Sequence, residues 1–359
     1  MRGIIVGSAD PRLFANTSAA EDLSTICSPL ATGFQLDTAG APNANGVTHI
    51  YIAIRRGPMK TPTTGTSVFA PYVTNTVAAS SSGSTSGSAL YRSDFVTDFV
   101  IQTRKASITD RYAVSRLTGN QYLLTNSTDA EATSVVPWDS NIAALNFTTD
   151  YGQWMFRRAP GFFDVVCYTG TGANRTVTHN LGVVPELIIV RSRSTGKNWG
   201  VYAASLGNGS FLNLNTTSAS GSTTTLWNST SPTSSVFTVG TALTTNENTT
   251  TYIAYLFASL SGVSKIGTYT GNGSSVTVTT DFQPRFILVK RTDSTGDWIV
   301  SDSARGLVAG NDPYLELNTT DAEVTNEDWV DITSTSFTVN QTTNNANVNT
   351  ATYIYLAIA

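Results

Sequence analysis

The residues that could form an active site are few in this sequence and lie far apart along it. Only two histidines occur, His49 and His179. A Ser-His-Asp triad needs a histidine that a carboxylate orients toward a nucleophile. His179 stands in the polar segment VTHNLG, where we expect a solvated turn residue. No HExxH, CxxC or clustered His/Cys pattern is present, so the sequence offers no transition-metal motif.

Carboxylates are the next candidates, because glycoside hydrolysis requires two of them facing one groove. The C-terminal region offers four, namely Asp297, Asp302, Asp321 and Glu323. The preceding copy of an internal repeat, described below, has other residues near those places: Asn198, Ala203, Thr217 and Ser220. We therefore expect solvated carboxylates in turns and at strand ends. A loop-bound calcium ion on Asp293 and Asp297 stays an open alternative.

Tryptophan could also contact a ligand, because an indole can stack on the apolar face of a sugar ring. The tryptophans recur in matching places of the repeat: Trp199 with Trp298, and Trp138 with Trp227 and Trp329. Recurrence in the same place favours core packing over sugar contact. Two arginine pairs, Arg55-Arg56 and Arg157-Arg158, follow the last strand of two repeats, and we expect them to pair with carboxylates between domains. We assign no catalytic, metal or cofactor-binding residue, and no ligand-binding residue.

The strongest pattern is an internal repeat. Four segments end alike, in the strings HIYIAIRRG, QWMFRRAPG, YIAYLFASLSG and YIYLAIA. Upstream of each ending a second shared string contains an asparagine: Asn16, Asn126, Asn215 and Asn318, which we call the register asparagines. They recur at intervals of about a hundred positions, which is the size of a domain and not of a solenoid repeat. Each unit should therefore have its own core.

The repeats divide the chain into four predicted domains: residues 1–57, 58–160, 161–262 and 263–359. The last two align almost element for element. The second is more divergent, and its segment 93–116 has Tyr112 where the others have tryptophan. The first contains only the C-terminal half of a unit. We expect either that the chain is part of a longer polypeptide or that a partner chain donates the missing strands.

Composition and periodicity predict an all-β fold. Only 13% of the residues are charged, while threonine, which favours strands, and asparagine, glycine and serine, which favour turns, are abundant. In the last unit we predict eight strands, near 266–270, 274–280, 285–291, 297–302, 313–318, 323–333, 336–340 and 351–358. That number predicts tandem antiparallel β-sandwich domains of jelly-roll or lectin-like type. Short joints between units predict domains that touch end to end.

Charge and hydropathy argue against two classes of partner. A formal net charge of −4 gives no basic surface for nucleic acid. The longest apolar runs are too short to cross a bilayer, so we expect no membrane insertion. The segment after Met1 lacks the features of a secretory signal. Cys27 and Cys167 lie in different units, and we expect two small buried residues and no disulfide.

The last unit resembles a repeat found in structural proteins of tailed bacteriophages, particularly marine and cyanobacterial phages. The resemblance rests on the strings GTYTGNGSSVTV, QPRFILVKRTDSTGDWIVSDSARG, YLELNTTDAE and ATYIYLAIA. It covers roughly the last 200 residues well and the second unit loosely. It implies a homo-oligomeric virion component, such as a tail fibre, a head fibre or a capsid decoration protein, and it implies no catalytic residues.

We therefore expect a non-enzymatic structural component of a phage particle, synthesised in the host cytoplasm and located in the virion. The expected partners are copies of the chain itself, other virion proteins and a glycan of the host surface during attachment. A carbohydrate-binding, lectin-like module is the alternative, and a polysaccharide-degrading enzyme comes third.

Overall fold

A computed structural model describes residues 10–12, 17–20, 22–24, 26–29, 34–37, 43–51, 60–73, 93–134, 136, 138, 150–308 and 310–359. Regular structure in these residues is almost entirely β-strand, in antiparallel sheets, and the predicted all-β class is therefore confirmed. The helical segments are single turns: η2 (Gly65–Ser67), η3 (Ala204–Leu206) and α1 (Leu243–Asn246). None of the described helices has the length and apolarity needed to span a membrane.

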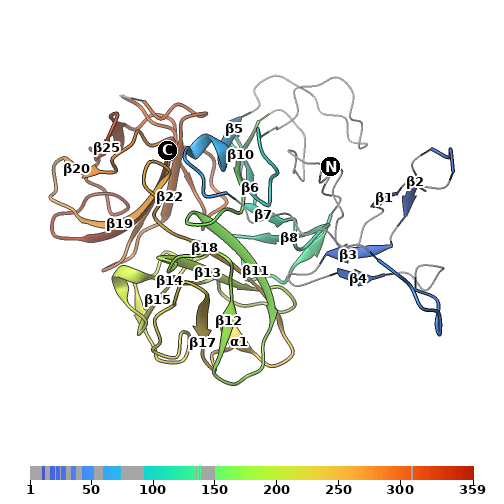
Figure 1. Cartoon of the computed structure of the whole chain (residues 1–359). Helices are drawn as coiled ribbons and strands as arrows, with labels where there is room; N and C mark the ends of the chain where they lie inside the picture. The colour runs from blue at the N-terminus through green and yellow to red at the C-terminus, as the bar shows by residue number, and fades with distance from the viewer. Residues whose placement is uncertain are drawn as a thin grey trace.

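Three large sheets form the body of the molecule, and each lies within one predicted repeat (Figure 1). The second unit has the order β5 (Phe69–Val73), β10 (Tyr151–Phe156), β6 (Phe99–Arg104), β7 (Tyr112–Ser115), β8 (Gln121–Leu124), β9 (Ala132–Thr133). The third has β11 (Phe163–Thr169), β18 (Thr251–Phe257), β13 (Leu187–Ser192), β14 (Gly200–Ala203), β15 (Ser210–Asn213), β16 (Gly221–Ser222). The fourth has β19 (Ser264–Thr270), β26 (Thr352–Ile358), β21 (Phe286–Arg291), β22 (Trp298–Asp302), β23 (Leu315–Glu316). The first and last strands of each unit thus lie side by side.

A smaller sheet covers the outer face of the large sheet in the third and fourth units. It consists of β12 (Arg175–Thr178) and β17 (Val236–Val239) in the third unit, and of β20 (Val276–Thr279), β25 (Ser336–Val339) and β24 (Val330–Ile332) in the fourth. Each unit has its own apolar cluster on this face, around Trp138, Trp227 and Trp329 in turn. The expectation of a core in every complete unit is therefore confirmed.

The opposite faces of the three large sheets meet in one shared core, which contains side chains of the second, third and fourth units. Phe156 of the second unit shows the arrangement, because its ring lies 5.9 Å from that of Phe257 in the third unit and 6.2 Å from that of Phe286 in the fourth. A small cavity of about 30 Å³ lies where the sheets meet, lined by all three units. The prediction of domains touching end to end is wrong, since these three units surround a common centre (Figure 1).

The predicted strands of the fourth unit agree with those observed, with one exception. The segment predicted as a strand over 323–333 pairs only at an isolated bridge on Val324 and in β24. Its polar residues around Asn326 and Asp328 are exposed. Jelly-roll or lectin-like topology stays a prediction.

The N-terminal region contains two short hairpins, β1 (Asp10–Arg12) with β2 (Asp22–Ser24) and β3 (Cys27–Pro29) with β4 (Phe34–Leu36). Its register asparagine, Asn16, and most of the closing string, residues 52–57 with Arg55-Arg56, lie outside the described residues. The prediction that residues 1–57 form half of a unit is therefore untested.

Candidate functional site

The register asparagines of the three complete units make the same pair of hydrogen bonds. In each, the side-chain oxygen accepts the backbone N–H that begins the fourth strand of the sheet, and the side-chain NH₂ donates to the residue before it. The acceptor bonds join Arg111 N to Asn126 (2.8 Å), Trp199 N to Asn215 (2.9 Å) and Trp298 N to Asn318 (2.7 Å). The donor bonds run to Asp110 (2.9 Å), Asn198 (3.0 Å) and Asp297 (2.7 Å). Asparagine recurs because this place needs a donor and an acceptor in one short side chain.

Asn318 is the most buried of the three, and its replacement by alanine removes both bonds at once. We expect Asn318→Ala to lower the free energy of unfolding by about 1 to 3 kcal/mol, since the Trp298 N–H is buried and loses its acceptor. Denaturant titration measures the loss. The matched control is Asn208, which is half-buried but donates to Ser231 through a solvent-exposed hydrogen bond, and Asn208→Ala should change stability little. Equal effects of the two substitutions would contradict the structural role of Asn318.

A ring of hydrogen bonds joins the three units around the shared core. A side-chain N–H from each unit donates to a backbone carbonyl at the end of a strand in the next. The three bonds are Trp199 Nε1 to Leu124 (2.9 Å), Trp298 Nε1 to Asn213 (3.0 Å) and Arg111 Nε to Glu316 (2.9 Å). Three backbone bonds repeat the pattern: Glu131 N to Arg193 (2.7 Å), Ser220 N to Thr292 (2.8 Å) and Glu323 N to Lys105 (2.7 Å). The ring closes between the second and fourth units, and we call that contact the closing interface.

These bonds also show which residue of the second unit matches the repeated tryptophan. Arg111 is the structural equivalent of Trp199 and Trp298, because its backbone N–H binds the register asparagine in the same way. The prediction that Tyr112 has this position is wrong. The adjacent Tyr112 points to the opposite face, where its ring contacts that of Tyr122. A one-residue slip in a strand exchanges the two faces, which is why the similarity of aromatic residues misled the alignment.

A fully buried cation also lies at each interface, namely Arg111, Arg191 or Lys290. Its position in the repeat is not the same in all three units. In the third and fourth units it lies on the third strand of the sheet, as Arg191 and Lys290, and donates to carbonyls on both sides of the interface. Thr103 occupies that place in the second unit, and its hydroxyl accepts a bond from Arg111 Nη1 at 2.8 Å. The same guanidinium donates to the Thr109 and Asp321 carbonyls. Arg111 therefore does the work of both the tryptophan and the cation.

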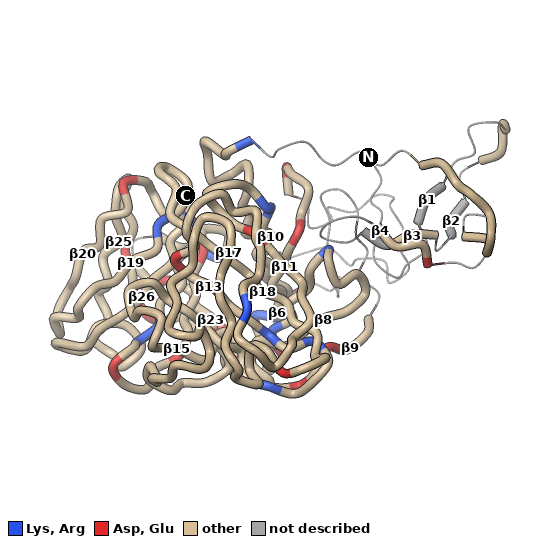
Figure 2. Tube along the Cα trace, turned by 60° about the horizontal axis from the view of Figure 1, so that its bottom comes forward, with Lys and Arg blue, Asp and Glu red and all other residues tan. Residues whose placement is uncertain are grey.

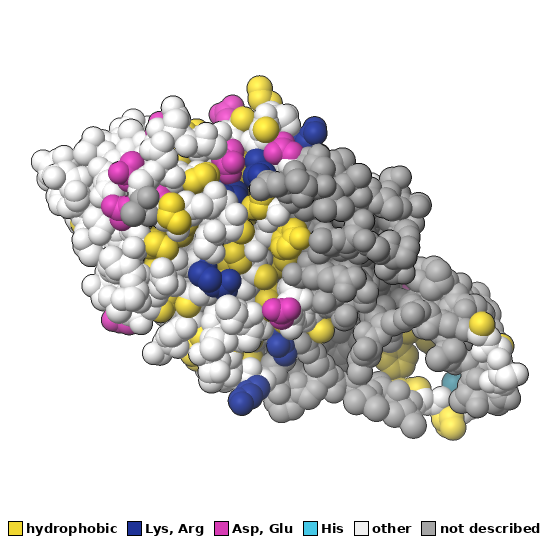
Figure 3. Space-filling model, turned by 90° about the horizontal axis from the view of Figure 1, so that it is seen from above, with side chains coloured by type: hydrophobic (Ala, Val, Ile, Leu, Met, Phe, Trp, Pro, Cys, Tyr) yellow, Lys and Arg dark blue, Asp and Glu magenta, His cyan; other side chains and the backbone are white. Residues whose placement is uncertain are grey.

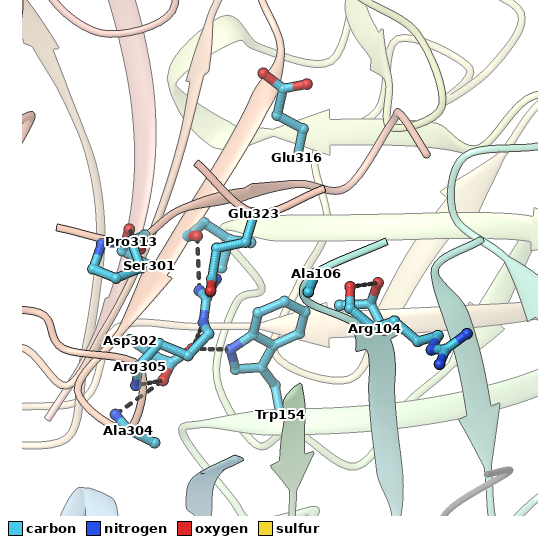
Figure 4. Close-up of polar contacts among 12 residues, drawn as sticks. Arg104, Ala106, Trp154, Ser301, Asp302, Ala304, Arg305, Pro313, Glu316 and Glu323 are labelled. Atoms are coloured by element: carbon cyan, nitrogen blue, oxygen red, sulfur yellow. Dashed lines mark hydrogen bonds and ion pairs between the residues drawn. The ribbon is translucent and has the colours of Figure 1, made fainter. Parts of the chain in front are cut away.

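The closing interface contains a buried ionic cluster (Figure 4). The interface between the second and third units has a different ion pair, Arg193 with Glu131 at 2.7 Å. Arg305 contacts Asp302 Oδ2 through Nε at 2.6 Å and Glu323 Oε1 through Nη1 at 3.0 Å. From the second unit, Trp154 Nε1 donates to the same Asp302 oxygen at 2.8 Å. Asp302 Oδ1 accepts the backbone N–H groups of Ala304 and Arg305. Both carboxylate oxygens of Asp302 thus accept two hydrogen bonds each, which gives this side chain a structural role.

Three of the four carboxylates named as candidates for glycoside hydrolysis are bound by other protein side chains. Asp302 is only 2% exposed, so the expectation of a solvated carboxylate is wrong for it, because the second unit covers that strand end. Glu323 shares Arg305 with it. Asp297 is bound to Asn318 and Asn345, and Asp321 is exposed.

The proposed calcium ligands also have protein partners. Asp293 forms an ion pair with Arg291 at 3.0 Å, while Asp297 binds the two asparagines just named. In the part of the chain that the structure describes, no three His, Cys, Asp or Glu side chains are grouped so that they could hold a metal ion.

His179 is buried, so the prediction of a solvated turn residue is wrong for it. The loop after β12 folds under residues 233–235, where the His179 N–H binds the Ser235 carbonyl. The ring is held on both sides: Nδ1 accepts the Leu181 N–H at 3.3 Å and Nε2 lies 3.1 Å from the Thr233 carbonyl. Burial lowers the pKa of His179, which favours the neutral ring in this structural role. His49 is exposed.

All six tryptophans are buried, which confirms that the recurring ones belong to the core. Their indole N–H groups have protein acceptors, for example Gly119 O for Trp138, Ser210 O for Trp227 and Ser301 Oγ for Trp329. An indole platform for a sugar is therefore not formed by them. Arg158 pairs with Asp164 at 2.6 Å across the joint between the second and third units, as predicted.

Glu316 of the closing interface lies apart from the ionic cluster in Figure 4. The pKa of its carboxyl group is raised. Burial, with the nearby charges of Asp297 and Asp321, raises its pKa to about 7. The folded protein therefore holds a proton on Glu316 at pH values where the unfolded chain has lost it. This contribution to stability is present below about pH 4.5 and is lost as the pH rises to about 7.

We expect Glu316→Gln to flatten the pH dependence of stability in this window. At pH 8 the variant should be more stable than the wild type by on the order of 1 to 2 kcal/mol, while at pH 4.5 the two should agree. Burial also raises the pKa of Asp312 to about 7, and the difference between wild type and variant isolates Glu316 from it. Urea titrations at several pH values measure the effect, and parallel curves would contradict it.

The described surface carries few charges. Lys, Arg, Asp and Glu are scattered along the trace in Figure 2, and in the view of Figure 3 uncharged polar side chains and backbone predominate between small apolar areas. This surface agrees with the low fraction of charged residues in the sequence, 13%.

Several residues that build the interfaces were missed from the sequence, above all Arg111, Trp154 and Arg305. The available signal was the contrast between units. Trp154 aligns with Tyr255 and Leu356 when the closing strands are superposed on their pairing registers, and Arg111 aligns with two tryptophans. Large side chains that differ between copies of a repeat indicate contacts in which the copies differ.

Comparison with known proteins gives one family. The model of a family described as Domain of unknown function (DUF7483) matches residues 157–359, which include the third and fourth units. A search of curated proteins finds no match.

Proposed function

We propose that this chain, which belongs to the DUF7483 family, is a non-enzymatic structural component of a phage particle, of the tail-fibre, head-fibre or capsid-decoration kind. The observation that carries the proposal is the closed ring of three units around one shared core. The phage assignment rests on the resemblance of the repeat strings.

The ring supports this role because it joins the units over large apolar areas and not by flexible linkers. Fully buried apolar faces and hydrogen-bonded strand ends leave little freedom between the units. Asp302, Arg305 and Glu323 form ion pairs within the fourth unit, and Asp302 also accepts the Trp154 N–H of the second unit, so this cluster would help to hold the two units together. A rigid block with an uncharged polar surface suits a particle exposed to variable salt, since few of its contacts would be screened.

In this role the partners would be further copies of the chain and other virion proteins, with the host surface reached during attachment. The location would be the virion. In this proposal the first 57 residues would supply the connection to a partner.

Immunogold electron microscopy of purified particles tests the proposal, with antibodies raised against the full chain. We expect gold at one repeated position on the particle, and the chain in the mass spectrum of particles banded on a density gradient. A chain that stays in the soluble fraction of the lysate, with unlabelled particles, would refute a structural role. Light scattering of the purified chain would then show whether it assembles with itself.

A further inference from the structure

Two segments of this chain share the tetrapeptide Gly-Asn-Gly-Ser. It occurs once in the third unit, at residues 207–210, and once in the fourth, at residues 271–274. In an Asn-Gly pair the backbone nitrogen of the glycine can attack the asparagine side chain readily, because glycine has no side chain that hinders the approach. Since the tetrapeptides are identical, a difference in reactivity between Asn208 and Asn272 has to come from the fold.

The fold holds the side chain of Asn272 in place. Its Nδ2 donates to the Ser275 carbonyl at 2.6 Å, and its Oδ1 accepts the Ser274 N–H at 2.9 Å and the Nδ2 of Asn347 at 3.3 Å. Asn347 is completely buried, so it is a fixed partner. The amide carbon of Asn272 therefore cannot turn toward the next backbone nitrogen unless these hydrogen bonds break.

The side chain of Asn208 is held much more weakly. Its Nδ2 donates to Ser231 Oγ at 3.0 Å, and this bond is exposed to solvent, where water can replace it. The glycines that follow the two asparagines also differ in their surroundings. A Cβ at Gly209 would have no atom within 4 Å, whereas a Cβ at Gly273 would lie 3.2 Å from the Cβ of Asn349. The loop at Asn208 therefore has room for its side chain to turn toward the backbone.

We propose that Asn208 is a site of spontaneous deamidation in the folded protein and that the fold protects Asn272. The Gly209 nitrogen forms a bond to Cγ of Asn208, and the side-chain nitrogen leaves as ammonia with the hydrogen of that backbone N–H. Water then opens the cyclic imide at one of its two carbonyl carbons and gives aspartate or isoaspartate. The net change replaces NH₂ by OH, needs only water and becomes faster as the pH rises, because the attacking nitrogen has to lose its proton. The inference does not depend on the proposed structural role.

Deamidation of Asn208 would change both the charge and the backbone of its loop. The new carboxylate is ionised at neutral pH. Isoaspartate also lengthens the backbone by a methylene group, shortly before β15 begins at Ser210. At the end of β15 the Asn213 carbonyl accepts the Trp298 indole N–H at 3.0 Å, across the interface between the third and fourth units. Chemical ageing at Asn208 would therefore act on a strand that joins two units.

Peptide mapping by mass spectrometry tests the proposal on the full chain, incubated in mildly alkaline buffer in the folded state and, separately, in guanidinium chloride. In the denaturant Asn208 and Asn272 should gain mass at closely similar rates, since their tetrapeptides are identical. In the folded protein Asn208 should react at least about tenfold faster than Asn272, because reaction at Asn272 requires the loss of its hydrogen bonds. A folded protein in which Asn208 stays unchanged, or in which the two asparagines react equally fast, would overturn the proposal.

Gly209→Ala is the matched variant. The φ of Gly209 lies outside the left-handed region and the position of a Cβ is open, so alanine should leave the melting temperature unchanged. Its methyl group hinders the attack, and most of the mass gain at Asn208 should therefore be lost, while the slow gain at Asn272 stays the same. A gain at Asn208 that continues at the wild-type rate in Gly209→Ala would show that no cyclic imide forms and would also overturn the proposal.

Discussion

Replacement of Asp302 by alanine is expected to lower the free energy of unfolding by about 3 to 5 kcal/mol, the usual effect of removing one partner of a buried ion pair. The carboxylate holds Arg305, the indole N–H of Trp154 and two backbone N–H groups. Without it Arg305 keeps only Glu323 and the Val300 carbonyl, and the Trp154 N–H is left unsatisfied between two units. The loss should therefore weaken the contact between the second and fourth units in particular.

Guanidinium titration followed by tryptophan fluorescence measures this effect. Asp281→Asn is the control, since Asp281 also pairs with a cation, Lys265 at 2.9 Å, but its side chain is 73% exposed, and asparagine tolerates its positive φ of 69°. An exposed pair of this kind contributes less than about 1 kcal/mol. Similar losses for the two variants would mean that the cluster in Figure 4 does not hold the closing interface together.

Arg111→Ala should have an effect of similar size, about 3 to 5 kcal/mol, because one side chain satisfies several buried acceptors. These are the carbonyls of Glu316, Thr109 and Asp321 and the hydroxyl of Thr103. Burial lowers the pKa of Arg111 to about 10, so the guanidinium is charged at neutral pH. In the other interfaces a tryptophan and a strand cation share these tasks.

The division of tasks predicts a rescue. Arg111→Trp alone should remain destabilised, since the cation is missing, but Thr103→Arg in addition should recover most of the loss by copying the pattern of Arg191 and Trp199. A double-mutant cycle in urea measures the coupling between the two positions. Additive effects of the two substitutions would show that Arg111 is not the equivalent of the tryptophan and the cation together.

The strands and their order along the chain could largely be predicted from the sequence. Short apolar segments bounded by Asn-Gly and Ser-Thr-Gly turns indicated β21, β22 and β26 within a residue or two. The register asparagines of the three complete units occupy equivalent positions, as the repeat predicted. Repetition of the tryptophans correctly indicated core residues.

The shared core could not be predicted in the same way. All six residues of β13 are buried. The sequence indicates this for the first four, which form an apolar run, but such a run does not tell which partner covers the second face. The partner is another unit about a hundred residues away. The ionic cluster was missed for the same reason, since Asp302 looks like an ordinary strand-end carboxylate until Trp154 is brought against it.

The ring is built from consecutive parts of one polypeptide, and this changes how it responds to dilution. Three separate copies of a single unit would have to find one another in solution, and their association would decline as their concentration falls. Here the short joints hold neighbouring units at an effective concentration on the order of millimolar. Only the closing interface lacks a covalent connection between its two units, and it carries the buried ionic cluster. The contacts between the three units should therefore not depend on protein concentration, and the ring should stay assembled when the protein is highly diluted.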